Sequence, residues 1–289
     1  MKVLIAGAGG QVGRALAAAA PEALTVLAAT RTELDITDRA GVDSLVNDFG
    51  PELIINAAAY TAVDNAESEP EAAYRINDLG ARNLAEAAAA ANARLIHIST
   101  DFVFDGTQCR PYAPAAEPAP LGVYGASKLA GEKSVLASLP GRALILRTAW
   151  VYAATGHNFV LTMLRLMRER GAVRVVCDQI GSPTAAASIA TAIWAFTLRP
   201  EISGIYHWSD AGVASWYDFA VAIAEEAAGC GLLPGLPGLT PIMTEEYPTP
   251  ARRPGFSVLD TRASIDAIGI QPPHWRASLR RVLGIIERG

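Results

Sequence analysis

The sequence predicts an α/β fold with a doubly wound parallel sheet and a smaller, irregular C-terminal lobe. Short apolar runs alternate with Ala-rich helical patterns through the first two thirds of the chain. Continuous apolar strands separated by helices are typical of a parallel sheet covered on both faces. After about residue 200 the alternation stops, and Gly, Pro and aromatic residues accumulate. We therefore expect one large sheet domain and a second, less regular lobe.

The expected elements follow this alternation in chain order. The predicted strands are residues 2–6, 24–29, 53–56, 94–99, 143–147 and 173–176. The predicted helices are residues 11–20, 39–48, 67–92, 124–138 and 158–170. We assign residues 1–150 and about 178–200 to the sheet domain, and about 151–177 and 201–289 to the second lobe. This lobe should close over the carboxyl edge of the sheet, where open α/β folds bind ligands.

Composition excludes several classes of protein. The 289 residues are 51% hydrophobic and 18% charged, which is typical of a globular chain with a large core. A net charge of -5 with scattered basic residues gives no surface for nucleic acid. The chain has no apolar run of the roughly 18 residues that a membrane span needs, and its first residues form a strand rather than a signal peptide. Three separated cysteines fit a reducing compartment, so we expect a cytoplasmic protein.

A glycine-rich turn lies between the first predicted strand and the first predicted helix. Gly7, Gly10 and Gly13 are spaced so that the backbone can turn tightly and approach a pyrophosphate at the N-terminus of the helix. This order of strand, turn and helix predicts a Rossmann domain that binds a dinucleotide. The residues expected at the pyrophosphate are Gly7, Gly10, Gln11, Val12 and Gly13.

The end of the second predicted strand carries the residues expected to select the cofactor. An acidic residue there usually holds the ribose 2′-hydroxyl of NAD, but here the strand runs into Arg31. An arginine can pair with a 2′-phosphate, which favours NADPH and leaves NADH possible. Arg31 could equally be a solvated surface residue. Asp35 could bind the adenine amino group or cap a helix, and Ile36 follows it in the expected site.

The residues that predict chemistry lie at the end of the fourth predicted strand and in the helix after it. Thr100 follows this strand, and Tyr124 and Lys128, four residues apart, share one face of the helix. With eight Tyr and three Lys, only about 0.08 such pairs are expected by chance. A phenol, an ammonium group and a hydroxyl can together give a proton to a carbonyl oxygen when a hydride source lies alongside.

Several further stretches carry a resemblance to a known family, and they occur in the family's order. They are Asn56–Glu67, Ser99–Asp101, Tyr124–Glu132, Arg147–Tyr152, Asn158–Phe159, Asp178–Thr184 and Arg253–Ser257. With these stretches the chain resembles the extended short-chain dehydrogenase/reductases and, within them, the dTDP-4-dehydrorhamnose reductase family. The resemblance covers nearly the whole chain.

The resemblance implies that hydride from NADPH attacks C4 of dTDP-4-dehydro-L-rhamnose and gives dTDP-L-rhamnose. In this reading Tyr124 donates the proton, Lys128 stabilises the phenolate and holds the nicotinamide ribose, and Thr100 binds the substrate oxygen. The residues expected near the middle of the cofactor are Ala57, Ala58, Ala59, Tyr60 and Thr61. The residues expected at the sugar nucleotide, besides Thr100 and Tyr124, are Asp101, Trp150 and Arg253. Asp101 could instead be a loop residue, Trp150 a core residue and Arg253 a surface residue.

The sequence departs from some members of this family at a metal site. Some relatives dimerise around a magnesium ion held by acidic side chains, and the aligned positions here are Ala15 and Ala187. We therefore expect no metal and a monomer or weak homodimer. No other part of the sequence has the spacing of a metal cage.

Two other functions stay open. The protein could be a reductase or epimerase for another 4-keto sugar nucleotide, because no residue reads the base or the hexose directly. It could also be a non-catalytic, NADP-binding regulatory subunit of a partner enzyme, although the intact pair of Tyr124 and Lys128 disfavours this. Dehydration is disfavoured because Asp101 is followed by Phe102 rather than by a second carboxylate.

Overall fold

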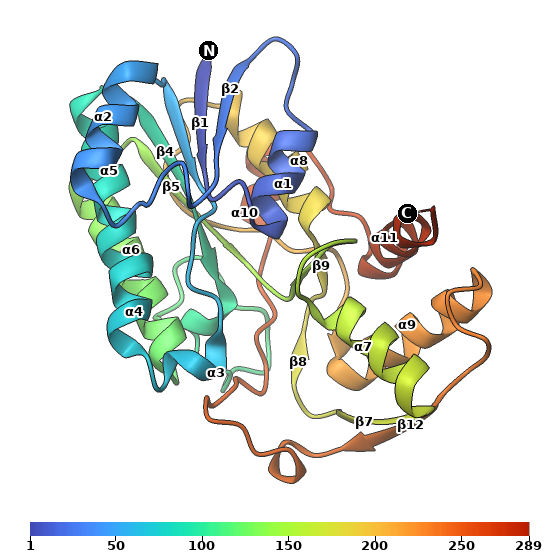
Figure 1. Ribbon diagram of the computed structural model, residues 1–289. Helices are drawn as coiled ribbons and strands as arrows, with labels where there is room; N and C mark the ends of the chain where they lie inside the picture. The colour runs from blue at the N-terminus through green and yellow to red at the C-terminus, as the bar shows by residue number, and fades with distance from the viewer. Residues whose placement is uncertain (289) are drawn as a thin grey trace.

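The computed structural model describes residues 1–288, with the side chains of residues 1–286. Its centre is a sheet of six parallel strands (Figure 1). These strands are β1 (Lys2–Ala6), β2 (Thr25–Ala29), β3 (Leu53–Asn56), β4 (Arg94–Thr100), β5 (Ala143–Thr148) and β10 (Gly204–His207). The strand order is β2-β1-β3-β4-β5-β10 and reverses direction between β1 and β3. This confirms the predicted doubly wound fold and places its ligand-binding crevice at the carboxyl ends of β1 and β3.

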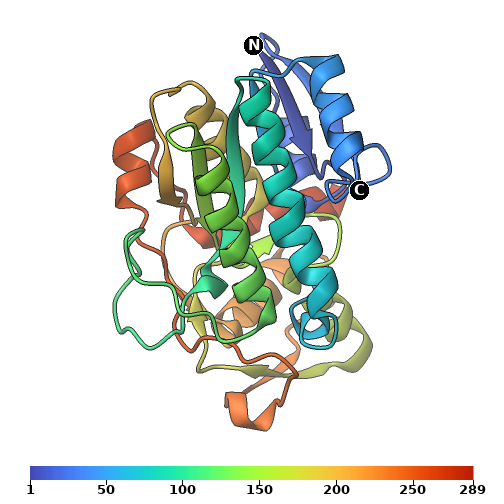
Figure 2. The same cartoon turned by 90° about the vertical axis from the view of Figure 1, so that its left-hand side faces the viewer.

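Helices cover both faces of the sheet (Figure 1). One face carries α1 (Gln11–Ala18), α8 (Ala186–Thr197) and α10 (Arg262–Ile268). The other carries α2 (Arg39–Phe49), α5 (Ala81–Ala90) and α6 (Val123–Ser138). Figure 2 shows α5 and α6 side by side over the sheet, with buried alanines such as Ala81 and Ala85 in this layer. Small side chains let these helices approach one another and the strands closely.

A second lobe lies at the carboxyl edge of the sheet (Figure 1). Its helices are α7 (Phe159–Arg170), α9 (Trp216–Gly229), α11 (Trp275–Arg288) and the 3-10 turn η3 (Thr244–Glu246). Its strands form three pairs, which are β7 (Ala172–Val176) with β12 (Gly238–Ile242), β6 (Val151–Tyr152) with β9 (Thr184–Ala185), and β8 (Ile180–Gly181) with β11 (Ala214–Ser215). The lobe has its own core around the buried Phe219 and Trp275.

The helix predicted over residues 67–92 is confirmed over most of its length, as one continuous run from Pro70 to Ala90. This run consists of α4 (Pro70–Tyr74), a π-helical stretch η1 (Arg75–Gly80) and α5, and the backbone is helical at both junctions. A separate short helix, α3 (Val63–Ala66), precedes it. Pro70 is the first residue of α4, and a proline suits this position because its missing N–H would have no partner within the helix. The chain therefore starts a new helix at Pro70. The remaining short element is a 3-10 turn after β4, η2 (Asp101–Val103).

The sheet contains one strand that the sequence did not predict, β10. It pairs with β5 at the edge of the sheet, whereas the predicted strand at 173–176 lies in the second lobe as β7. Trp208 after β10 is 1% exposed and packs in the core beneath α8, together with α10. The predicted division therefore differs from the structure, because β10 and α10 lie within 201–289 but belong to the sheet domain. The irregular pattern in this region reflects a chain that passes between the two lobes.

Candidate active site at the carboxyl edge of the sheet

The glycine-rich turn packs tightly on the strand ends. Gly7 has a φ of 85°, and its N–H and that of Ala8 donate to the carbonyl of Ala29 at 3.0 and 2.9 Å. A Cβ on Gly13 would lie 2.2 Å from the Gly7 oxygen, so only glycine fits there. Gly10 is exposed and caps α1 without a side chain. The N-terminus of α1 is thus open to an anion, as a pyrophosphate requires.

Gln11, the first residue of α1, contacts the second lobe. Its Oε1 accepts from Asn158 Nδ2 at 2.9 Å, and its Nε2 donates to the His157 carbonyl at 3.3 Å. Asn158 also accepts from Leu161 N at 3.1 Å and caps α7. The side chain of Gln11 therefore links the turn to α7. Its neighbour Val12 packs on the core beneath α1.

The residues after β2 divide between surface and core. Arg31 is exposed and available for a phosphate. Asp35 Oδ1 accepts from the backbone and hydroxyl of Thr37 at 2.9 and 2.8 Å, and the backbone hydrogen bond is the main cause of the lowered pKa of Asp35. Ile36 is 4% exposed, and a Cβ on Gly80 would lie 2.6 Å from its side chain. The side chain of Ile36 is therefore part of the helix packing.

The loop at 57–61 is held by a residue whose role the sequence did not reveal. Asn77 accepts from Tyr60 N at 2.8 Å and donates to the Tyr60 carbonyl at 3.1 Å and to Ser127 Oγ at 2.9 Å. Its position in the π-helical stretch η1 lets it reach both this loop and α6. The Tyr60 hydroxyl points to Glu69 on the surface, at 2.8 Å. Ala57, Ala58 and Ala59 are half-buried beside the turn and Thr61 is exposed, so this stretch offers mainly its backbone to a ligand.

Thr100, Tyr124 and Lys128 come together where β4 ends. Lys128 is 2% exposed, and its Nζ donates to the Ile98 carbonyl at 2.7 Å. Burial raises the pKa of Tyr124 to about 12, with the charge of Asp101 adding to this and hydrogen bonding with Thr100 opposing it. Burial lowers the pKa of Lys128 to about 8, and the charge of Glu132 opposes this shift. Tyr124 therefore holds its proton near neutral pH, and Lys128 can change its charge there.

Asp101 is a buried carboxyl group beside this cluster. It is 1% exposed, and its Oδ1 accepts from Thr100 Oγ1 at 3.1 Å. The second oxygen, Oδ2, has no hydrogen-bond partner among the described residues. Burial raises the pKa of Asp101 to about 6, with opposing contributions from the neighbouring Ser257 and Thr100. An unpaired acceptor at this depth suits a ligand hydroxyl.

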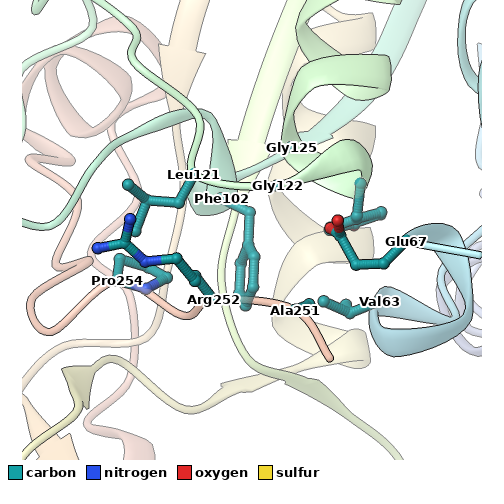
Figure 3. Close-up of a pocket in the computed structure, with 10 residues that line it drawn as sticks. Val63, Glu67, Phe102, Leu121, Gly122, Gly125, Ala251, Arg252 and Pro254 are labelled. Atoms are coloured by element: carbon teal, nitrogen blue, oxygen red, sulfur yellow. The ribbon is translucent and has the colours of Figure 1, made fainter. Parts of the chain in front are cut away.

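A carboxylate at the end of α3 holds the N-terminus of α6. Gly122 caps α6 without a side chain, and Glu67 Oε1 accepts from Val123 N at 2.8 Å. Figure 3 shows the Glu67 carboxylate at a small cleft, with Phe102 between Glu67 and Arg252. Tyr124 also lines this cleft. The Phe102 ring meets Tyr124 edge to face at 5.6 Å. An acidic group near a helix N-terminus is stabilising, so Glu67 helps to position the helix that carries Tyr124.

A buried ion pair anchors the same helix to β5. Arg147 donates to the two oxygens of Glu132 at 2.9 and 2.6 Å, and the two side chains are 1% and 2% exposed. Ser99 on β4 also donates to Glu132. The Arg147 guanidinium lies 5.1 Å from the centre of the Phe104 ring. Glu132 thus connects α6 with β4 and β5, one helical turn after Lys128.

Trp150 packs against residues of the second lobe and does not offer both faces of its ring to a ligand. Its φ is 47°, and its ring stacks in parallel on Trp216 with centres 3.5 Å apart. A Cβ on Gly181 would lie 2.4 Å from the Trp150 ring. Trp216 covers one face of the indole, so that face cannot also stack on a sugar or a base. The alternative interpretation of Trp150 as a packing residue fits this arrangement.

Arg253 joins the two lobes beside a large cavity. Its NH2 pairs with Asp64 Oδ2 on α3 at 2.8 Å, and its NH1 donates to the carbonyl of Ala251 at 3.2 Å. The cavity, of about 640 Å³, is lined by α7, β7, the η3 region and Arg253. In Figure 3 the neighbouring Arg252 lies instead at the small cleft beside Phe102. Only Arg253 of these two arginines lines the large cavity.

Ala15 and Ala187 lie on α1 and α8, which pack against each other. Among the described residues, no group of three or more His, Cys, Asp or Glu side chains could hold a metal ion. None of the helices that the structure describes is long and apolar enough to cross a membrane.

Comparisons with known proteins agree with this geometry. The family described as RmlD substrate binding domain matches residues 1–287. The chain is 43% identical to a dTDP-4-dehydrorhamnose reductase of Aggregatibacter actinomycetemcomitans, with 99% of both chains covered, and 41% identical to that of Escherichia coli, with 98% and 97% covered. The structure of a Bacillus anthracis dTDP-4-dehydrorhamnose reductase in complex with NADP matches with a TM-score of 0.92 and 38% identity, over 98% of this chain and 99% of that one. The chain therefore belongs to the dTDP-4-dehydrorhamnose reductase family of oxidoreductases.

Proposed function

We propose that this chain reduces dTDP-4-dehydro-L-rhamnose to dTDP-L-rhamnose, with NADPH as the hydride source and Tyr124 as the proton donor. The observation that carries the proposal is the group formed by the buried Thr100 and Lys128 and the half-buried Tyr124 at the carboxyl edge of the sheet. The relatives with 43% and 41% identity are named for this activity.

The residues at the crevice fit NADPH. The open N-terminus of α1 at Gly10 would hold the pyrophosphate, and the exposed Arg31 would hold the 2′-phosphate. The loop at 57–61, fixed by Asn77, would line the middle of the cofactor. When bound, NADPH supplies the hydride for the C4 ketone.

The protein's own part of the reaction is the proton. Tyr124 is a neutral phenol near pH 7, because burial raises its pKa to about 12, so it can donate to the oxygen of the ketone. The Thr100 hydroxyl lies at the same edge. It donates to Asp101 Oδ1 in this structure and would turn to donate its one proton to the ketone oxygen. Lys128 in its ammonium form stabilises the phenolate that Tyr124 leaves. Asp101 Oδ2, which is buried and has no partner among the described residues, would accept a hydrogen bond from a hexose hydroxyl.

The sugar nucleotide would lie between this cluster and the 640 Å³ cavity of the second lobe. A nucleotide base needs an apolar slot, and α7 and β7 supply apolar walls through Phe159, Met163 and Val175. Arg253 at the rim would bind the diphosphate, and Asp64 holds its guanidinium in place.

One assay tests the proposal as a whole. Purified protein is mixed with NADPH and dTDP-4-dehydro-L-rhamnose, and loss of reduced-nicotinamide absorbance is followed together with the product's stereochemistry. Faster turnover of a different 4-keto sugar nucleotide, or a product epimerised without NADPH consumption, would favour the second candidate function. No turnover of any keto sugar nucleotide would contradict the reductase proposal and favour a regulatory subunit.

Replacing Arg31 by alanine should weaken discrimination between the two cofactors. A charge-assisted hydrogen bond contributes about 1.5–3 kcal/mol, so the NADPH-to-NADH ratio of kcat/KM should fall by about 10-fold or more. Arg82→Ala, an exposed arginine on α5, serves as the control and should leave the ratio unchanged. An unchanged ratio in Arg31→Ala would show that Arg31 is only a surface residue.

Replacing Arg253 by alanine should raise KM for the sugar nucleotide by about 10- to 100-fold, since one charged contact to the diphosphate is lost. KM for NADPH should stay within about twofold, because Arg253 lies in the second lobe. Arg252→Ala is the matched control, because its side chain lies at the other cleft. Equal effects of the two substitutions on KM would contradict the proposed role of Arg253.

A further inference from the structure

Lys128 lies at the end of a series of buried hydrogen bonds that connects two strands, β3 and β4, with helix α6. Ala58 N donates to Asn56 Oδ1 at 3.0 Å, and Asn56 Nδ2 lies 3.0 Å from His97 Nδ1. On the far side of the imidazole, His97 Nε2 lies 3.3 Å from Lys128 Nζ. Asn56 and His97 are each 1% exposed, so both side chains are shielded from bulk solvent. The reductase mechanism above uses neither side chain.

The donors and acceptors in this series of hydrogen bonds determine which imidazole nitrogen of His97 carries the proton. The backbone N–H of Ala58 can only donate, so it fixes Oδ1 of Asn56 as the acceptor. The other amide atom of Asn56 is therefore the NH₂ group, which donates to His97 Nδ1. Burial and the charge of Lys128 keep the pKa of His97 well below its usual value, so the ring is neutral and has a single proton. That proton must lie on Nε2, the nitrogen that faces Lys128.

An imidazole N–H facing Lys128 distinguishes the two charge states of the lysine. A neutral amine has a lone pair and can accept from His97 Nε2–H, whereas an ammonium group has only donors. The ammonium form thus meets the positive end of an N–H dipole and keeps the Ile98 carbonyl as its acceptor at 2.7 Å. The contact stabilises the amine relative to the ammonium.

We infer that His97, held in its Nε2–H form by Asn56, is a positioning residue that favours the neutral amine of Lys128 and so sets the upper pH limit of the reduction. The inference rests on the proposed function for the role of Lys128. The hydrogen-bonding part of it concerns residues of this chain alone, so it can be tested without substrate or cofactor.

The other ionisable groups near Lys128 are neutral, are paired with another charge, or raise the pKa of Lys128. On α6 itself, Tyr124 is neutral at the working pH, and Glu132 raises the pKa of Lys128. Glu132 is paired with Arg147 from β5. From β4 only the neutral His97 faces the amine among the described contacts, and Asn56 behind it on β3 has no charge. Burial lowers the pKa of Lys128 to about 8 against the opposing charge of Glu132, and the contact with His97 at 3.3 Å would act in the same direction as burial.

The first test determines the tautomer directly. The chain has four histidines, so ¹⁵N-histidine labelling gives a spectrum in which His97 is assigned by its loss in His97→Gln. We expect the proton of His97 on Nε2 and an unprotonated Nδ1 between pH 6 and pH 9, in the protein without ligands. A proton on Nδ1 would overturn the inference.

The second test follows the charge of Lys128. The chain has three lysines, Lys2, Lys128 and Lys133, so ¹³Cε-lysine labelling resolves the titration of each. In Asn56→Asp one carboxylate oxygen still accepts from Ala58 N and the other accepts from His97 Nδ1–H, which turns Nε2 into an acceptor for the ammonium group. The midpoint of Lys128 should rise by about one pH unit or more.

His97→Gln is the uncharged counterpart of this variant, because its amide oxygen can accept from the ammonium group without adding a carboxylate. The Lys128 midpoint should rise here too, and Lys2 and Lys133 should not move in either variant. An unmoved Lys128 midpoint in both variants would overturn the inference. A rise in Asn56→Asp alone would also overturn it, since the added charge would then explain the effect.

Activity measurements on the same two variants distinguish this inference from the proposed function. In an active enzyme, the alkaline limb of kcat against pH should follow the Lys128 midpoint upward in both variants, while KM for NADPH changes little. An active enzyme whose alkaline limb stays fixed while the midpoint moves would overturn the role in reduction. Absence of reductase activity together with the expected spectra would count against the proposed function and support the assignment of His97.

Discussion

Replacing Tyr124 by phenylalanine should lower kcat about 10²- to 10⁴-fold, because the change removes the only proton that the phenol can give to the ketone oxygen. The ring stays in its edge-to-face contact with Phe102, so the fold and the melting temperature should change little. Since NADPH would bind mainly through the turn and the loops, its Kd should stay within about threefold. Stopped-flow measurement of NADPH oxidation checks kcat, and quenching of protein fluorescence checks Kd.

The matched control is Tyr206→Phe on the edge strand β10, which β4 and β5 separate from the cofactor crevice at β1 and β3. It removes the same hydroxyl from a half-buried tyrosine and should leave kcat within twofold. If Tyr124→Phe kept more than about a tenth of the wild-type kcat, proton donation by Tyr124 would have to be abandoned. Equal losses in the two variants would point to a general packing effect instead.

Replacing Glu132 by glutamine should be the most destabilising of the single changes considered. It leaves the Arg147 charge buried without its partner, and breaking a buried ion pair in this way costs about 3–5 kcal/mol. For a chain of this size each kcal/mol corresponds to about 2–4 °C, so Tm should fall by about 6–20 °C. Scanning calorimetry of the protein without ligands measures this.

Two further variants test whether the unpaired charge of Arg147 causes the expected fall in Tm. Glu169→Gln removes one partner of the exposed ion pair between Arg165 and Glu169, and Tm should change by no more than about 2 °C, because such pairs contribute little. Changing Glu132 and Arg147 together to methionines should recover much of the loss, because no unpaired charge remains. A Tm within 2 °C of wild type for Glu132→Gln alone would contradict this account.

The parts of the fold that follow from local sequence were predictable. β1, the glycine turn and α1 follow directly from a strand, three spaced glycines and an amphipathic run, and the structure has them at nearly the expected residues. The helical spacing of Tyr124 and Lys128 was predictable for the same reason, because i and i+4 always share a helix face.

The parts that depend on long-range contacts were not predictable. β10 has only four residues, and its place beside β5 is decided by the packing of Trp208 and α10 rather than by its own pattern. The partner of Arg253 is Asp64, 189 positions away along the chain. His97 carries no motif signal, since its neighbours Asn56 and Lys128 come from a different strand and a helix. The covered face of Trp150 likewise depends on Trp216, which a sequence pattern cannot pair with it.

The position of β10 has a consequence for how the molecule is built. The chain leaves the sheet after β5 to form β6 and α7, returns with α8 and β10, leaves again for α9 and β12, and returns once more with α10 before α11. Neither half of the active site is therefore a continuous piece of sequence, and no single cut separates them. The crevice and the cavity are parts of one interwoven unit, so a truncation at residue 150 would remove an edge strand and two covering helices from the sheet that carries Tyr124.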